Sequence, residues 1–427
     1  MLNAAFVLLV LVSVLAAAAS GRMEALSTGI LDDAGRSVQL ALGLIGALSF
    51  FLGLMRVVQD GGALRLLARA AAPVMRRLFR GVPADHPAMS AMLLSIASNI
   101  LGLGSAATPF GIRAMQELDT LNPRKGVATN AMVTFLSINT AGFAILPTTV
   151  LALRASAGSK APGSILAATW FASGCATIVG IASAILLSRL PWFKATDPGV
   201  MPPSMVSSEA VDAPPQTRPA VSRFIPWIAG GYIVILIGVL IRAASTMPAG
   251  ELARTIMSYW TLPLLVALIV LFGWARGVKV YEVFLEGAKE GFQVALRIIP
   301  YLLAIVVAVG MFRASGCLDV VVQVLSPLTS PLGLPAEAVP LAVLRPLSGS
   351  GAYGVMSEIV TTHGPDSYLG ILASTMQGST DTTFYILSVY FGAVGIKKTR
   401  HAVLAGLLTD AAGIAAAVFI CRLVWHG

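Results

Sequence analysis

The sequence predicts an all-α integral membrane protein of about nine transmembrane helices plus two re-entrant hairpins, arranged as two inverted repeats. Three observations support this fold class: an apolar composition, a series of apolar runs of membrane-spanning length, and an order of motifs that recurs in both halves of the chain. Of the 427 residues, 56% are hydrophobic and 11% are charged. A soluble domain carries about 25% charged residues, so this chain cannot cover its surface in water.

The positive charge of the chain indicates membrane topology rather than nucleic-acid binding. The formal net charge is +9, but the basic residues form short clusters between apolar runs, as they do in cytoplasmic loops. We therefore expect no nucleic-acid partner. The four histidines and three cysteines lack the spacing of a metal site or a disulfide framework, and no cofactor is predicted.

Apolar runs predict the spans. Five runs contain no charged residue and have the length of about 20 residues that a spanning helix needs; they are residues 1–21, 127–153, 161–188, 224–241 and 255–275. Four further spans are shorter or interrupted; they are residues 38–55, 298–312 extended back to 292, 368–392 and 402–421. The first run ends in small residues like a signal peptide, but it lacks a basic start, so an uncleaved anchor is expected.

Basic residues predict the orientation. They gather in two loops, at Arg65, Arg69, Arg76, Arg77 and Arg80, and at Lys397, Lys398 and Arg400. A cytoplasmic N-terminus places both loops inside, as expected for a multi-pass protein of the bacterial cytoplasmic (inner) membrane. This topology requires that residues 87–112 and 336–362, which are apolar but broken by glycines, enter the bilayer without crossing it. Both are predicted to be re-entrant hairpins.

A proline-rich segment divides the chain into two related halves. Residues 194–223 contain six prolines and almost no aliphatic run, which is typical of a linker, and they separate residues 1–193 from 224–427. The same motifs recur in order in both halves: Gly53-Leu-Met-Arg56 and Gly310-Met-Phe-Arg313, Pro73 and Pro327, residues 101–106 and 348–352, and residues 137–140 and 374–377. An odd number of spans separates the copies, so the repeats are inverted, and such repeats hold sites near the midplane.

The first hairpin carries polar residues among its glycines. Asn99, Ser105 and Thr108 supply hydrogen-bond donors and acceptors for a polar solute or a dehydrated cation. The alternative is close helix packing by small residues, which does not by itself require Asn99.

The second hairpin carries Arg345, Ser348 and Ser350. An arginine at membrane depth costs about 2.5–3.5 kcal/mol on insertion scales, so we expect its charge to be offset by Asp381, Glu358 or an anionic group of the substrate. The alternative is that Arg345 lies near the interface and extends its side chain to water.

A run of polar residues interrupts the span at 368–392. Gln377, Ser379, Thr380 and Asp381 predict an unwound junction between two half-helices, which could hold Na⁺, a proton or a substrate. Its uncharged counterpart in the first half contains Asn139 and Thr140. Asp410, in the last span, is either a proton relay or a structural carboxylate.

These segments resemble the spore maturation proteins A and B, joined here into one chain. Residues 99–118 are similar to the signature of the A protein, and residues 345–351 and 377–385, continuing to 395–400, are similar to that of the B protein. The resemblance implies two Gate-type repeats of the nucleoside-recognition domain that concentrative nucleoside transporters and the B-type ferrous iron permease share. Asp381 departs from the family pattern, in which glutamate is more usual, so a shorter reach is implied there.

The leading interpretation is a secondary permease for a small polar or anionic solute, driven by H⁺ or Na⁺ or running downhill. The alternative is a non-transporting envelope or spore-maturation scaffold. An intramembrane enzyme using His363, Glu358 or Asp366 has no supporting catalytic motif, so no enzyme is predicted. The expected partners are the lipid bilayer and the solute, and the sequence leaves a homo-oligomer open.

Overall fold

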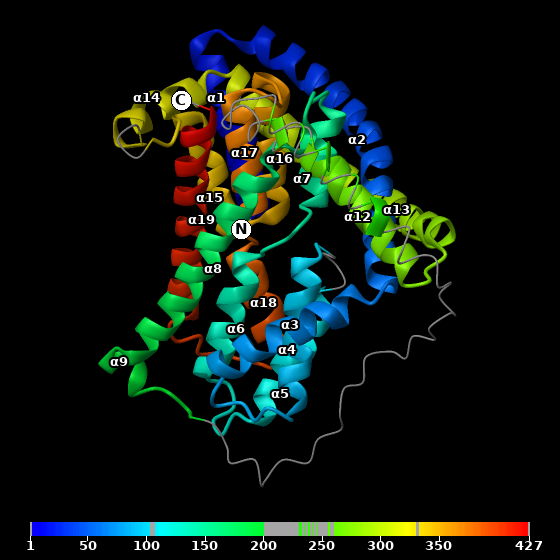
Figure 1. Ribbon diagram of the computed structural model, residues 1–427. Helices are drawn as coiled ribbons and strands as arrows, with labels where there is room; N and C mark the ends of the chain where they lie inside the picture. Colours follow the sequence, from blue (N-terminus) through cyan, green and yellow to red (C-terminus); the bar gives the residue numbers. More distant parts are fainter. Residues whose placement is uncertain are drawn as a thin grey trace.

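The computed structural model describes residues 2–102, 107–199, 260–329 and 333–425, together with short runs and single residues between 230 and 256. In this part of the chain every regular element is a helix, and one isolated β-bridge joins Val127 to Lys398. The all-α prediction is therefore confirmed (Figure 1). Ser105, most of the predicted span at 224–241 and most of the predicted linker lie outside the described residues.

The first half begins with two long helices and ends with another. Its elements are α1 (Leu2–Ser20), α2 (Met23–Asp60), α3 (Ala63–Leu78), α4 (Pro87–Ile100), α5 (Ala107–Thr120), α6 (Asn130–Ala141), α7 (Thr148–Ser156), the 3-10 helix η2 (Pro162–Ile165), α8 (Leu166–Arg189) and α9 (Pro191–Lys194).

The second half shows the same succession of helix lengths from α13 to α19 that the first shows from α2 to α8. Its described elements are α12 (Thr261–Ala275), α13 (Val280–Ala314), α14 (Cys317–Thr329), the 3-10 helix η6 (Ala336–Ala338), α15 (Val339–Leu347), α16 (Gly349–His363), α17 (Tyr368–Ser379), α18 (Thr383–Gly392) and α19 (Ala402–Trp425). In each half a long helix is followed by a proline-containing helix, a pair of short helices, an interrupted helix and a final long helix.

Helices α2 and α13 are much longer than the apolar runs that predict them, which cover residues 38–55 and 292–312. Their charged extensions remain helical because the charges pair across the two helices. Arg313 contacts Asp33 at 3.5 Å, and Arg56 contacts Glu286 at 4.0 Å. Hydropathy marks only the apolar middle of such a helix, so the predicted bounds are too short.

Glycines allow α2 and α13 to pack backbone against backbone. A Cβ atom on Gly291 would lie 2.5 Å from the Cα of Ser49, and one on Gly287 would lie 2.6 Å from the carbonyl oxygen of Leu52. Residue numbers rise along α13 as they fall along α2 in these contacts, so the two helices are antiparallel.

Helices α8 and α19 form the second antiparallel pair, at the left of Figure 1. The rings of Phe171 and Phe419 have centroids 6.2 Å apart. Further along, a Cβ atom on Gly180 would lie 2.6 Å from the hydroxyl of Thr409. Large apolar side chains on both helices remain exposed, among them Ile178 and Phe419, as expected for surfaces that face lipid.

Length and hydropathy alone identify fewer spans than the sequence analysis predicts. Among the described helices, two segments are long and apolar enough to cross a membrane: Pro162–Arg189, which joins η2 to α8, and α19. The predicted spans at 127–153 and 368–392 are each divided into two short helices. The predicted total of nine is therefore not established by this criterion.

The two interrupted helices, α6–α7 and α17–α18, are joined at both ends by buried arginines. Arg154 at the end of α7 is 0% exposed, and its Nη2 lies 3.0 Å from Oδ1 of Asp366, in the loop before α17. Arg400, in the loop after α18, donates to the carbonyl of Ala128 at 3.1 Å and to Oδ1 of Asn130 at 2.9 Å, at the start of α6. The end of each interrupted helix is thus attached to the start of the other.

The glycine contacts predict the stability of the α2–α13 pair. Gly291→Ala should lower the free energy of unfolding by about 1–3 kcal/mol, because the new methyl group overlaps backbone atoms of α2. Thermal unfolding of the detergent-solubilised protein measures the effect. Gly46→Ala in α2 is the matched control, since no heavy atom lies within 4 Å of its Cβ position. Equal melting temperatures for the two variants would contradict this packing.

The Arg154 contact predicts a second stability difference. Asp366→Asn should destabilise the fold by about 1–3 kcal/mol, because it leaves the charge of a fully buried arginine without its carboxylate. The control is Glu282→Gln, which removes an exposed ion pair with Lys279 whose side chains are 64% and 77% exposed. Such a pair contributes about 0–1 kcal/mol. A loss no larger than that of the control would refute a stabilising role for Asp366.

Candidate functional site

The interruptions of the two broken helices contact each other directly. The backbone N–H of Asp381, between α17 and α18, donates to the carbonyl of Thr140 at the end of α6, with an N···O distance of 2.6 Å. Gly142 ends α6 with a φ of 56°, and a Cβ atom there would lie 3.0 Å from the nitrogen of Asp381. Glycine at this position therefore serves both the turn and the close approach.

The tip of each predicted hairpin lies against the interruption in its own half. In the first half, the N–H of Ile145 donates to the carbonyl of Ile100 at 2.7 Å. In the second, a Cβ atom on Gly349, at the turn between α15 and α16, would lie 2.9 Å from the hydroxyl of Thr382. The segments that the sequence analysis selects are thus brought together by the fold.

Arg345, near the end of α15, is directed at the second interruption. Its side chain is 4% exposed. Nη2 donates to the carbonyl of Gln377 at 2.9 Å and Nη1 to the hydroxyl of Thr382 at 3.3 Å. Within the described residues, Nε has no hydrogen-bond partner. The alternative that Arg345 extends to an aqueous interface is wrong, because the guanidinium is buried in protein.

The expected carboxylate partners of Arg345 are occupied elsewhere. Glu358 pairs with Arg313 at 2.7 Å, so it does not compensate Arg345. Asp381 is exposed, and its Oδ1 accepts from the N–H of Thr382 at 2.7 Å. No ion pair of the described residues includes Arg345, although the charge of Asp381 acts on it. The predicted close pair is therefore replaced by hydrogen bonds to the interruption.

Asp366, which together with His363 and Glu358 is considered as an acid or base of an intramembrane enzyme, forms an ion pair with Arg154. His363 is exposed at the end of α16. Glu358 and His363 both lie on α16, whereas Asp366 lies in the loop between α16 and α17.

The remaining predicted residues of the second half differ in exposure. Ser348 caps α16 by accepting from the N–H of Gly351 at 3.0 Å, and Ser350 is exposed beside it. Ser379 is buried and donates to the carbonyl of Met376 at 2.9 Å. Ser379 therefore completes the end of α17, whereas the exposed hydroxyl of Ser350 lies 3.4 Å from that of Ser348.

Asn139 of α6 connects α4 of the first half with α18 of the second. Its Oδ1 accepts from Nδ2 of Asn99 on α4 at 2.8 Å and from the hydroxyl of Ser95 at 3.1 Å. The hydroxyl of Tyr390 on α18 donates to the same oxygen at 3.4 Å. The buried hydroxyl of Thr140 has no partner among the described residues, and Thr108 is half-buried in the first turn of α5.

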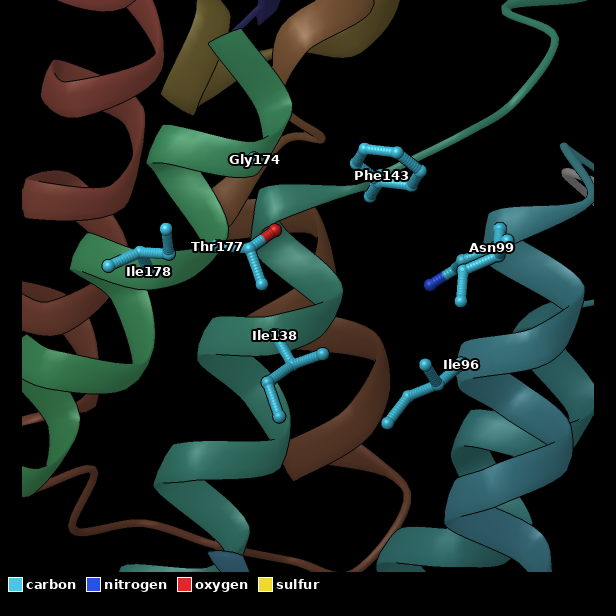
Figure 2. A pocket seen from close by; sticks show the side chains of 8 residues that line it. Ile96, Asn99, Ile138, Phe143, Gly174, Thr177 and Ile178 are labelled. Atoms are coloured by element: carbon cyan, nitrogen blue, oxygen red, sulfur yellow. The ribbon is translucent and has the colours of Figure 1, made fainter. Parts of the chain in front are cut away.

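A cavity of about 340 Å³ opens between α4, α6 and α8. Figure 2 shows Ile96 and Asn99 of α4 projecting toward Ile138 of α6, with Thr177 of α8 beyond. Its lining is mostly apolar, with the Asn99 amide and the Thr177 hydroxyl as polar groups. Of the predicted site residues, Asn99 lines this cavity, whereas Arg345 and Asp381 do not.

Asp410 of α19 belongs to the site, although the sequence analysis left its role open. Its side chain is 2% exposed, and Oδ2 accepts from the hydroxyl of Thr383 at 2.6 Å. Thr380 lies near the carboxylate, but within the described residues its hydroxyl and Oδ1 of Asp410 have no hydrogen-bond partner. In the sequence, Asp410 is marked only as a single carboxylate inside a long apolar segment. The packing of α19 shows that this carboxylate contacts the interruption between α17 and α18.

Comparison with known proteins identifies the family. The model of the family described as nucleoside recognition, named Gate, matches residues 41–156 and 295–397. Spore maturation protein B of Bacillus subtilis (strain 168) is 49% identical over 169 residues, which are 40% of this chain and 95% of that protein. Spore maturation protein A of the same organism is 33% identical over 199 residues, 47% of this chain and 100% of that protein.

Two weaker similarities concern membrane proteins. Inner membrane protein YjiG of Escherichia coli (strain K12) is 30% identical over 84 residues, 19% of this chain and 55% of that protein. The crystal structure of the Alcanivorax borkumensis YdaH transporter aligns over 98% of this chain and 96% of that chain, at 13% identity and a TM-score of 0.42. A score of this size does not establish a shared fold.

The apolar composition, the long apolar helices and the matched family agree that this is a membrane protein. The A-like and B-like matches each cover nearly the whole length of a separate relative, so one chain combines what are two proteins in B. subtilis. The chain belongs to the nucleoside-recognition (Gate) family, as a member that joins spore maturation A-like and B-like sequences.

Proposed function

We propose that this chain is a secondary permease for a small polar or anionic solute in the bacterial inner membrane. The observation that carries the proposal is the meeting of two helix interruptions, through Thr140 and Asp381, with a hairpin tip lying against each. In membrane proteins, irregular backbone is tolerated where it is enclosed by protein or lines a watery cavity. Discontinuous helices of this kind form the substrate and ion sites of many transporters.

The proposed topology has nine spans, two re-entrant hairpins and two inverted repeats. It is supported by the antiparallel packing of counterpart helices, since α2 lies against α13 and α8 against α19. The two arginine contacts add to this support. Arg154 and Arg400 join opposite ends of the interrupted helices in equivalent ways, as expected for halves related by a two-fold axis in the membrane plane.

Arg345 supports an anionic group on the solute. Its guanidinium is buried beside the interruption, hydrogen-bonded to neutral groups and included in no ion pair of the described residues. A buried positive charge is stabilised by a negative partner. A carboxylate or phosphate on the solute supplies one, and Ser350 and Gln377 lie at the same junction to bind its polar atoms.

The second candidate is a non-transporting role in spore maturation or the envelope. It is favoured by the names of the two relatives, which refer to spore maturation and not to a solute. In that case the buried polar contacts would serve packing alone, and the family's fold would be a scaffold for partners. The two candidates differ in whether Arg345 affects solute movement without affecting folding.

Transport assays in proteoliposomes test the leading proposal. The purified protein should take up at least one member of a panel of nucleosides, small carboxylates and inorganic phosphate. Arg345→Lys should reduce uptake about tenfold or more, because lysine keeps the charge but loses the paired donors that reach Gln377 and Thr382. Arg113→Lys is the control, since Arg113 forms a partly exposed ion pair with Glu117 within α5.

Equal uptake by wild type and Arg345→Lys would show that Arg345 does not bind the solute. If no member of the panel moves, and Arg345→Ala folds and retains the cellular phenotype, the scaffold candidate is favoured. Gel filtration of each variant separates a loss of function from a loss of folding.

Cysteine labelling tests the inverted hairpins. In a background with the three native cysteines replaced, Thr108→Cys and Ser350→Cys occupy the first turns of α5 and α16. An impermeant thiol reagent should modify the two positions from opposite sides of the membrane, because inverted hairpins enter from opposite faces. Modification of both positions from the same side would contradict the proposed topology.

A further inference from the structure

The interruption between α17 and α18 lies between two opposite charges. On one side, Arg345 of α15 donates to Gln377 and Thr382. On the other, Asp410 of α19 accepts from Thr383. The two charged groups do not form an ion pair with each other, but each lies within the electrostatic field of the other. One short stretch of extended backbone thus contacts both a buried cation, at Thr382, and a buried anion, at Thr383.

Asp410 is the buried acidic group of this arrangement. The charged groups that act on it are Arg345 and Asp381, and its close neighbours are the hydroxyls of Thr380 and Thr383. The α8 residues that face this part of α19, Ala176 and Gly180, carry no charge. Burying an ionised carboxylate without an ion pair is costly. Asp410 can therefore take up a proton and become neutral in this environment.

Asp381 is less suited to the same role. Its carboxylate is exposed, and it caps the next backbone N–H, that of Thr382. Asp381 therefore completes the turn between α17 and α18, whereas Asp410 is enclosed by protein without an ion pair among the described residues.

We propose that Asp410 is a proton-binding site coupled to Arg345, so that the proton and an anionic solute are loaded together. This rests on the proposed permease function. In the empty state, the Asp410 carboxylate offsets the charge of Arg345 across the interruption. When Asp410 takes up one proton, its O–H bond forms, no other bond changes, and the Arg345 charge loses the part of its offset that Asp410 supplies, while the charge of Asp381 still acts on it. A solute anion then restores the balance at Arg345, so proton and anion enter as a neutral pair.

Infrared difference spectroscopy tests the proton site without any solute. Buffer exchange between acid and alkaline conditions should produce carboxyl C=O bands in the purified wild-type protein, among them a band from Asp410 that is distinct from those of the exposed carboxyl groups. The band should disappear in Asp410→Asn and remain in Asp381→Asn and in the surface control Asp319→Asn, whose side chain forms an exposed ion pair with Arg22. A band that survives in Asp410→Asn, or that disappears in Asp381→Asn instead, overturns the proposal.

A second variant protects the test against misfolding. Thr383→Val has nearly the same shape but lacks the hydroxyl that donates to Asp410. Since that hydrogen bond favours the ionised carboxylate, the midpoint of the band should move to higher pH while the band itself remains. An unchanged midpoint in a folded Thr383→Val protein counts against Asp410 as the titrating group.

Proton coupling is then measured with a pH-sensitive dye inside proteoliposomes. Addition of phosphate or small carboxylates should acidify the lumen with wild type, whereas Asp410→Asn should exchange the solute without moving protons. Accumulation driven by a proton gradient in Asp410→Asn would overturn the coupling. If the wild-type protein moves no solute, the proposed permease function is contradicted. The infrared experiment still decides whether Asp410 binds a proton, because it uses no solute.

Discussion

An interrupted helix inside a membrane exposes backbone N–H and C=O groups that lipid cannot satisfy, and the rest of this structure depends on how they are paired. The carbonyl of Thr140 is paired with the N–H of Asp381, so each interruption completes the other. Ile145 receives its partners from the first hairpin and from Trp170 of α8. Each break is stable only when the hairpins and the long helices are packed around it.

The two buried arginines differ in the partners that surround their charge. The buried Arg154 has a full carboxylate partner and several hydroxyl and carbonyl acceptors, which identifies it as a structural connection. Arg345 has acceptors but no ion pair, and it lies where the backbone is irregular. Both arginines are buried, but Arg154 is paired within the fold, whereas Arg345 has no ion pair among the described residues and can bind a negative group of a ligand.

The sequence predicted the helical class and the polar interruption at Asp381, while the two re-entrant hairpins stay a prediction. It missed the length of α2, because ion pairs to α13 keep charged segments such as that around Asp33 helical. It also named Glu358 as a possible partner of Arg345, together with Asp381, whose charge does act on Arg345. Glu358 is close to Arg345 in the sequence, but the packing of α16 on α13 turns it toward Arg313, and no local pattern reports that choice.

Composition and order along the chain determined by themselves that this is an all-helical membrane protein with two similar halves, because apolar length and motif order are properties of the chain alone. Tertiary structure decided which polar groups meet. Asp410 and Arg345 stand 65 positions apart, and each joins the interruption only because α15 and α19 both pack against α18. Contacts between distant segments depend on packing in three dimensions, which the spacing of residues in one dimension does not encode.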